Sequence, residues 1–182
     1  MEDKKLFIPV VLGTGREGRK SEYPAHLITE ELNKRENVEA MLVDAREHAS
    51  QVTVPPWGKG GADEIETEWK RIVLKADALI IVTPEYNHGY PGELKILLDS
   101  LFDEYKGKPV GLCGVSKGMW GGTRVVEHIK PVLVEFSMIP IRSALYFPKV
   151  EEAFDKEGDL QDESARERVG AFIDALLAQI KN

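Results

Sequence analysis

The sequence has a single cysteine, no excess of positive charge and no long apolar stretch. Cys113 is its single cysteine, so no disulfide can form within the chain, which is typical of a reducing compartment. The formal net charge is −7 and no basic tract is present, which argues against nucleic acid as a partner. No apolar run approaches the roughly 18 residues that a membrane span requires. We therefore expect a cytoplasmic protein that has neither a nucleic acid nor a membrane as its partner.

Histidine is also scarce. The four histidines, His26, His48, His88 and His128, are scattered along the chain. Their positions do not match the short spacings of metal ligands, and we find no nucleophile paired with a base. The sequence therefore predicts neither a metal site nor a catalytic side chain that reacts covalently.

Short apolar runs alternate with segments whose apolar residues follow the helical period. This alternation predicts an α/β fold, a doubly wound parallel sheet of five strands with helices on both faces. Because no linker or internal repeat interrupts the 182 residues, we expect one domain spanning residues 1–182. The predicted strands are Leu6–Leu12, Val38–Val43, Ala78–Val82, Val110–Val115 and Ile139–Tyr146, and helical patterns occur within Ala25–Leu32, Ile65–Val73, Leu94–Tyr105, Val125–Phe136 and Ala165–Ile180.

The third predicted helix is apolar on more than one face. A single stripe facing the core would not need all of Ile96, Leu97, Leu98, Leu101 and Phe102. Such a helix is either buried more deeply within the subunit or packed against a second copy of the chain. We favour the second copy.

The first loop, Gly13–Ser21, allows two interpretations. Its three glycines match the G-x-G-x-x-G pattern of dinucleotide-binding Rossmann domains, and Asp44 would then bind a ribose. In that arrangement the helix starts within the motif, so Pro24 would lie in the helix interior at a cost of about 3 kcal/mol. If Ser21 is the N-cap instead, Pro24 lies in the first turn, where no intrahelical bond is lost.

The longer version of this loop suits a phosphate monoester. It carries the hydroxyls of Thr14 and Ser21 and the cations of Arg16, Arg19 and Lys20, and it leads into a helix N-terminus. Hydroxyls, cations and free helical N–H groups are together the ligands that a terminal phosphate prefers.

The stretch Thr83–Asp99 reads T-P-E-Y-N-H-G-Y-P-G-E-L-K-I-L-L-D and joins the buried third strand to the third helix. A loop at the carboxyl end of a strand in an open parallel sheet is where ligands bind. The amides of Glu85–Gly89 can donate to a ring that gains negative charge on reduction, and Tyr86 and Trp120 can wall such a ring.

Three segments, in this order, resemble the NADPH-dependent FMN reductase family of flavodoxin-like proteins, which includes azobenzene, chromate and quinone reductases. The first is the phosphate loop, the second is the P-E-Y-N stretch, and the third follows the fourth predicted strand. The matching residues are Gly13-Thr14-x-Arg16 with Ser21, then Pro84-Glu85-Tyr86-Asn87 with Gly89-Tyr90-Pro91-Gly92 and Leu94-Lys95, then Val115-Ser116 with Gly118 and Gly121-Gly122-Thr123-Arg124.

The resemblance implies a flavodoxin-like sheet of strand order 2-1-3-4-5, FMN as cofactor, NADPH or NADH as electron donor, and homodimers or homotetramers. It also implies a two-step reaction, in which hydride passes to the flavin and the electrons then pass to a quinone, azo compound, free flavin or similar small molecule. The implied contacts are Thr14, Arg16 and Ser21 with the phosphate, Pro84, Glu85, Tyr86 and Asn87 with the ring, and Ser116 and Gly118 at the other edge of the ring.

Two alternatives remain. A flavodoxin-like electron carrier, or a flavin-binding interaction protein without turnover, would share the fold, although flavodoxins of that type lack the P-E-Y-N motif. A Rossmann NAD-dependent dehydrogenase is the weaker alternative, because it depends on the glycine pattern and on Asp44 alone.

Overall fold

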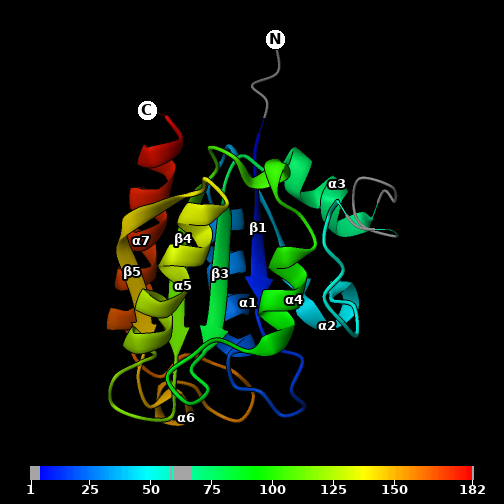
Figure 1. The fold of residues 1–182 in the computed structure, drawn as a ribbon. Helices are drawn as coiled ribbons and strands as arrows, with labels where there is room; N and C mark the ends of the chain where they lie inside the picture. Colours follow the sequence, from blue (N-terminus) through cyan, green and yellow to red (C-terminus); the bar gives the residue numbers. More distant parts are fainter. Residues whose placement is uncertain (1–4, 58, 60–66, 182) are drawn as a thin grey trace.

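The computed structural model describes residues 5–57, 59 and 67–181. Five parallel strands form one sheet in the order β2-β1-β3-β4-β5, with helices on both faces (Figure 1). This is the predicted flavodoxin-like order, and each apolar run that predicted a strand forms one. The strands are β1 (Leu6–Leu12), β2 (Val38–Asp44), β3 (Leu79–Pro84), β4 (Pro109–Val115) and β5 (Ile139–Phe147).

The helices also follow the predicted pattern, with two short additions. Ile65, which belongs to the second predicted helix, lies outside the described residues. In the part of the chain that the structure describes, no helix is both long enough and apolar enough to cross a membrane. The helices are α1 (Glu22–Asn33), α2 (Ala45–His48), α3 (Glu68–Lys75), α4 (Gly92–Asp99), α5 (Thr123–Glu135), α6 (Val150–Ala153) and α7 (Glu163–Ile180), with a 3-10 turn η1 (Asp103–Tyr105).

The third helix is shorter than its pattern predicts, because α4 ends at Asp99 and the pattern continues only as η1. The Ser100 hydroxyl donates to the Leu97 carbonyl at 2.7 Å, and the Ser100 N–H donates to the same oxygen. Hydrogen bonds of this i to i+3 kind tighten the last turn and satisfy a carbonyl that would otherwise continue the helix.

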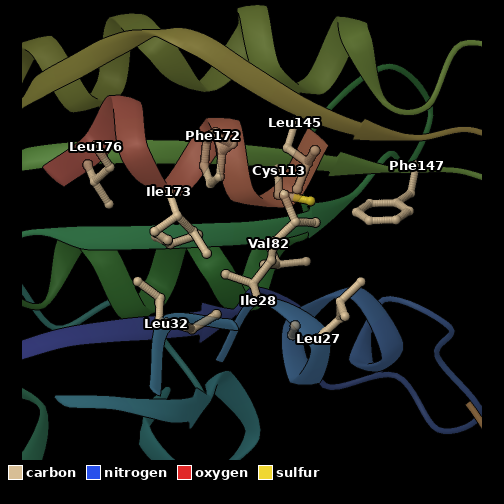
Figure 2. Packing of buried hydrophobic residues seen from close by; sticks show 14 of the residues in the cluster. Leu27, Ile28, Leu32, Val82, Cys113, Leu145, Phe147, Phe172, Ile173 and Leu176 are labelled. Carbon is tan, nitrogen blue, oxygen red and sulfur yellow. The ribbon is translucent and has the colours of Figure 1, made fainter. Parts of the chain in front are cut away.

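Two hydrophobic cores hold the layers together, one on each face of the sheet. Residues of α1 and α7 pack on one face, where Ile28, Phe172 and Ile173 meet Val82 and Cys113 of the sheet (Figure 2). Residues of α3, α4 and α5 pack on the other face. Each fully buried Leu, Ile or Phe contributes about 1.5–3 kcal/mol, so these two cores fix the sheet and the loops at its ends.

Burial within the subunit accounts for much of the apolar surface of the third predicted helix. Leu97, Leu98 and Leu101 are fully buried in the core on the face of the sheet that α3, α4 and α5 cover. Ile96 and Phe102 remain partly exposed. An interface with a second copy would therefore use these two residues rather than the whole set.

The carboxyl ends of β1, β3 and β4 point to the same end of the sheet, and the loops that follow them gather there (Figure 1). The chain continues from β1 to the edge strand β2, whereas β3 leads towards β4 on the other side. Loops that leave adjacent strands in opposite directions open a crevice between them, which is the usual ligand site of such sheets.

Candidate functional site

A cavity of about 430 Å³ lies at this end of the sheet, within the range of small-molecule sites. Residues from the loops after β1, β3 and β4 line it together with the start of α6. Most of the predicted site residues are on its wall, whereas Thr14, Asn87 and Gly118 are not. The lining residues are Arg16, Lys20, Ser21, Pro84, Glu85, Tyr86, Val115, Ser116, Lys117 and Val150.

Ser21 lies on the cavity wall where the first loop leads into α1. It is the N-cap residue of α1, as predicted, and Pro24 lies in the first turn. Ser21 is only 2% exposed as a residue. Its hydroxyl makes no capping hydrogen bond and has no hydrogen-bond partner among the described residues. An unpaired buried hydroxyl costs about 1–3 kcal/mol, and this one lies on the cavity wall at a helix N-terminus. The arrangement fits a phosphate, which would accept from the hydroxyl and from the first N–H groups of α1.

Two cations flank Ser21 on the cavity wall. The Lys20 ammonium donates to the Tyr23 hydroxyl at 3.1 Å, and this hydrogen bond raises the pKa of Lys20. The Arg16 guanidinium donates through Nε to the Tyr86 hydroxyl at 3.0 Å. The raised pKa keeps Lys20 positively charged, and both side chains lie where a phosphate would need cations.

The Thr14 hydroxyl faces protein rather than the cavity. Thr14 is fully buried, and its Oγ1 donates to the Glu93 carboxylate at 2.9 Å. The Gly15 N–H donates to the same carboxylate oxygen at 2.8 Å. Although burial raises the pKa of Glu93, these hydrogen bonds and one from its own N–H lower it below the usual range. Sequence reasoning missed Glu93, and its only signal was an acidic residue in the first turn of α4.

Glu85 belongs to the ring loop, which we define as residues 84–89, and its side chain supports α5. Its carboxylate lies 3.3 Å from both the Val125 N–H and the Arg124 guanidinium, which donate to it. A carboxylate at a helix N-terminus satisfies an otherwise unpaired N–H and complements the helix dipole. The Glu85 N–H donates to Val115 of β4 at 3.1 Å. Glu85 therefore lines the cavity, while its carboxylate and its backbone N–H both form hydrogen bonds within the protein.

The rest of the ring loop is a tight hairpin. Tyr86 and Gly89 exchange two backbone hydrogen bonds of 2.9 Å, and Asn87 and His88 between them have φ of 50° and 68°. Two left-handed residues between a bonded pair form a type I′ turn. Of the five loop amides that we expected to face a ring, those of Glu85, Tyr86 and Gly89 are thus already bonded to protein. The other two of these five amides, those of Asn87 and His88, have no backbone hydrogen bond among the described residues.

The third loop closes the cavity beside β4. The Ser116 hydroxyl donates to the Gly118 carbonyl at 3.0 Å, which holds the turn that follows the strand. Gly122 has φ of 81°, and a Cβ there would lie 2.7 Å from the Val115 nitrogen. Only glycine allows this close approach of the loop to β4. Trp120, predicted as a possible ring wall, does not line the cavity and is 60% exposed.

Asp44 is committed to ion pairs within the protein. The Arg19 guanidinium, which is almost fully buried, binds both carboxylate oxygens, and the Arg46 N–H donates to the carboxylate at 2.9 Å as the N-cap bond of α2. Burial raises the pKa of Asp44, but the hydrogen bonds from Arg19 and Arg46 lower it to about 2. A ribose would have to displace these donors, which argues against the Rossmann interpretation.

Comparisons with known proteins find similar chains. Residues 8–152 match the family described as NADPH-dependent FMN reductase. Over 109 residues the chain is 34% identical to an NAD(P)H-dependent FMN reductase of Pseudomonas aeruginosa, covering 57% of this chain and 59% of that relative's length. It is 26% identical over 179 residues to an FMN-dependent NADPH-azoreductase of Staphylococcus aureus, covering 95% and 94% of the two chains.

A solved structure shares the fold. The flavoenzyme NAD(P)H:(acceptor) oxidoreductase FerB of Paracoccus denitrificans superposes with a TM-score of 0.78 at 21% identity, over 97% of each chain. The family match includes all three loops that meet at the cavity, from the phosphate loop to the start of α6. The protein therefore belongs to the NADPH-dependent FMN reductase family.

Proposed function

We propose that this protein is an FMN-dependent NAD(P)H oxidoreductase, formed by a single domain spanning residues 1–182. NADPH or NADH is the electron donor, and a quinone, azo compound, free flavin or similar small molecule is the acceptor. FMN, when bound, supplies the hydride transfer that links the two. The observation that carries the proposal is the buried Ser21 hydroxyl, unpartnered among the described residues and set in one cavity with the ring loop.

The chain's own residues bind and orient the cofactor. Ser21, Arg16 and Lys20 bind the phosphate, because they place one hydroxyl and two cations at the N-terminus of α1. Pro84 and Tyr86 lie against one side of the ring and Ser116 against its other edge, where β3 and β4 end. No protein side chain has to form a covalent bond in this reaction, since the cofactor carries the reactivity.

Three predicted contacts take a different form in this proposal. Thr14 supports the phosphate loop, because its hydroxyl donates to Glu93. Asn87 offers its free backbone N–H from the hairpin turn rather than a side chain on the cavity wall. Gly118 keeps the third loop compact, since its carbonyl accepts from both Ser116 and the Lys149 N–H.

Absorbance of the purified protein, loaded with FMN, tests the function. We expect a yellow protein that bleaches when NADPH is added without oxygen and that regains its colour when a quinone follows. Bleaching too slow to sustain steady-state turnover would indicate the electron carrier or interaction protein instead. A colourless protein that cannot be reconstituted with FMN would refute both flavin functions.

The acceptor is best identified by comparing turnover on a quinone, an azo dye and free FMN at equal concentrations. The azoreductase that aligns along nearly the whole chain supports including an azo dye. The same experiment with NADH in place of NADPH establishes the donor. An acceptor ranking that stays unchanged with either donor is expected, since both steps use one cavity.

We also propose a cytoplasmic homodimer or homotetramer. The support for the assembly is the partly exposed Ile96 and an apolar cavity of about 530 Å³ that Phe102 and Val132 line between α4 and α5. Ile96→Glu should lower the mass measured by light scattering, because a charge would then enter an apolar interface. Leu74→Glu, on the exposed face of α3, is the control. An unchanged mass for Ile96→Glu would remove α4 from the interface.

A further inference from the structure

A directed chain of hydrogen bonds joins the phosphate loop to the ring loop. The Thr14 hydroxyl donates to Glu93 at 2.9 Å, so its single proton is used there. The bond of 3.0 Å between the Thr14 and Tyr86 hydroxyls must then be donated by Tyr86. The Tyr86 oxygen in turn accepts from Arg16 Nε at 3.0 Å. The order is Arg16 to Tyr86 to Thr14 to Glu93, and each donor has one acceptor.

This chain fixes the position of the Arg16 guanidinium. Arg16 lies on an exposed loop, and among the described residues Nε is the only part of its guanidinium that donates a hydrogen bond. The guanidinium also lies over the Tyr86 ring, with its Cζ 6.0 Å from the ring centroid. With Nε held, the two terminal nitrogens are left for a ligand in the cavity that Arg16 shares with Ser21. A planar guanidinium held in this way can present a pair of donors to one phosphate.

We propose that the Tyr86 hydroxyl is a specificity-determining group that favours FMN over unphosphorylated flavin, because it orients Arg16 towards the phosphate. Glu93 is the positioning residue at the far end of the chain, where it also holds the Gly15 N–H. Tyr86 belongs by sequence to the ring loop, yet its hydroxyl acts on the other end of the cofactor. This inference rests on the proposed function and deepens it.

The test compares FMN with riboflavin, which has the same ring and no phosphate. Flavin fluorescence titrations of the apoprotein give both dissociation constants for Tyr86→Phe, Thr14→Val and the double variant. Neither substitution changes the net charge. We expect each to weaken FMN binding about tenfold more than riboflavin binding, since a hydrogen bond to a charged group is involved. Tyr146→Phe, outside the cavity, is the control.

The double variant separates a connected chain from independent contacts. If the chain acts as a unit, the double variant should bind FMN about as weakly as either single variant. Multiplied effects would mean that Thr14 contacts the phosphate directly, and would overturn the inference. Equal losses of FMN and riboflavin affinity in Tyr86→Phe would also overturn it, because Tyr86 would then serve the ring alone.

These outcomes are distinct from failure of the proposed function. A wild-type protein that binds neither flavin would refute the flavin site itself. A wild-type protein that binds FMN and riboflavin equally would refute the phosphate end, and with it this inference. Thermal unfolding of each apoprotein variant separates a loss of affinity at the cavity from a loss of fold. Tyr86→Phe keeps the aromatic ring, whereas Thr14→Val removes one hydrogen-bond donor from Glu93.

Discussion

The pair Arg19–Asp44 gives a prediction that links stability to the choice between the two interpretations of the first loop. Arg19 is 4% exposed, and its guanidinium binds Asp44 and the Thr14 carbonyl. Asp44→Asn keeps the shape of the side chain and one acceptor oxygen, but it removes the charge. The buried guanidinium would then keep the Glu22 carboxylate, 3.7 Å from its Nε, as its counter-charge among the described residues.

The size of the effect follows from what Arg19 loses. Hydrogen bonds to charged groups contribute about 1.5–3 kcal/mol each, and breaking a fully buried ion pair costs about 3–5 kcal/mol. Asp44 is partly accessible, with 16% of its side chain exposed, and asparagine retains one acceptor. We therefore expect a loss of about 2 kcal/mol in the free energy of unfolding, or about 4–8 °C in Tm for a chain of this length.

The effect should depend on pH with a definite sign. The pKa of Asp44 is lowered to about 2 in the folded protein, against about 3.9 for an unperturbed aspartate. A lowered folded-state pKa gives a contribution that is complete above the unfolded value and is lost as the pH falls. The stability difference between wild type and Asp44→Asn should thus be constant from pH 7 to about 4 and should close towards pH 2.

Urea unfolding at pH 7, 5, 4 and 3 measures this difference. Glu152→Gln serves as the control, because it removes the exposed pair with Lys149 and should change stability by less than about 1 kcal/mol. An Asp44→Asn variant as stable as this control would refute the structural role of the pair. So would a gap that persists at pH 3 without narrowing. An Asp44→Asn variant that keeps nearly the stability of the wild type but loses its affinity for NAD would support the Rossmann alternative.

Two further substitutions test the cavity. Ser21→Ala should weaken FMN binding by about tenfold or more while slightly stabilising the apoprotein, because it removes an unpaired buried hydroxyl. Fluorescence titration and thermal unfolding measure the two effects, with Ser143→Ala on β5 as the control, and a destabilised apoprotein would contradict the reasoning. Gly122→Ala should lower the free energy of unfolding by about 2–3 kcal/mol, since φ is 81° and a Cβ would clash with β4. Gly118→Ala meets no such contact, and equal losses in urea unfolding would argue against the clash.

The strands and the long helices could be predicted because burial leaves a local pattern in the sequence. A strand buried on both faces is a continuous apolar run, and the run Leu6–Leu12 gives the bounds of β1 directly. The short helices α2 and α6, with four residues each, are too short to show a period. The apolar positions of Leu101 and Tyr105 indicated a longer α4, because both side chains are buried and lie four positions apart, although α4 ends at Asp99 and Tyr105 belongs to η1.

The site could be predicted in its location but not in its internal connections. Loops after parallel strands must meet at one end of the sheet, so Ser21 and the ring loop were expected close together. Tyr86 and Glu93 both form hydrogen bonds with Thr14, from which they are separated by 72 and 79 positions in the sequence. No local period or spacing encodes such contacts. For the same reason Thr14 was assigned to the phosphate from its residue type, whereas its hydroxyl faces Glu93.

The ring loop is held by a different element at each of its polar positions. Glu85 binds the start of α5 and Tyr86 binds the phosphate loop, while the hairpin closes on itself through two backbone bonds. These bonds form as the chain folds, so the loop does not have to be ordered when a ligand arrives, and less binding free energy is lost to ordering. The Ser21 hydroxyl differs from these groups, because it has no partner among the described residues and would gain one from the ligand. On our proposal, the preformed ring loop and the unpartnered Ser21 hydroxyl place the gain in affinity at the phosphate, which is the part that distinguishes FMN from riboflavin.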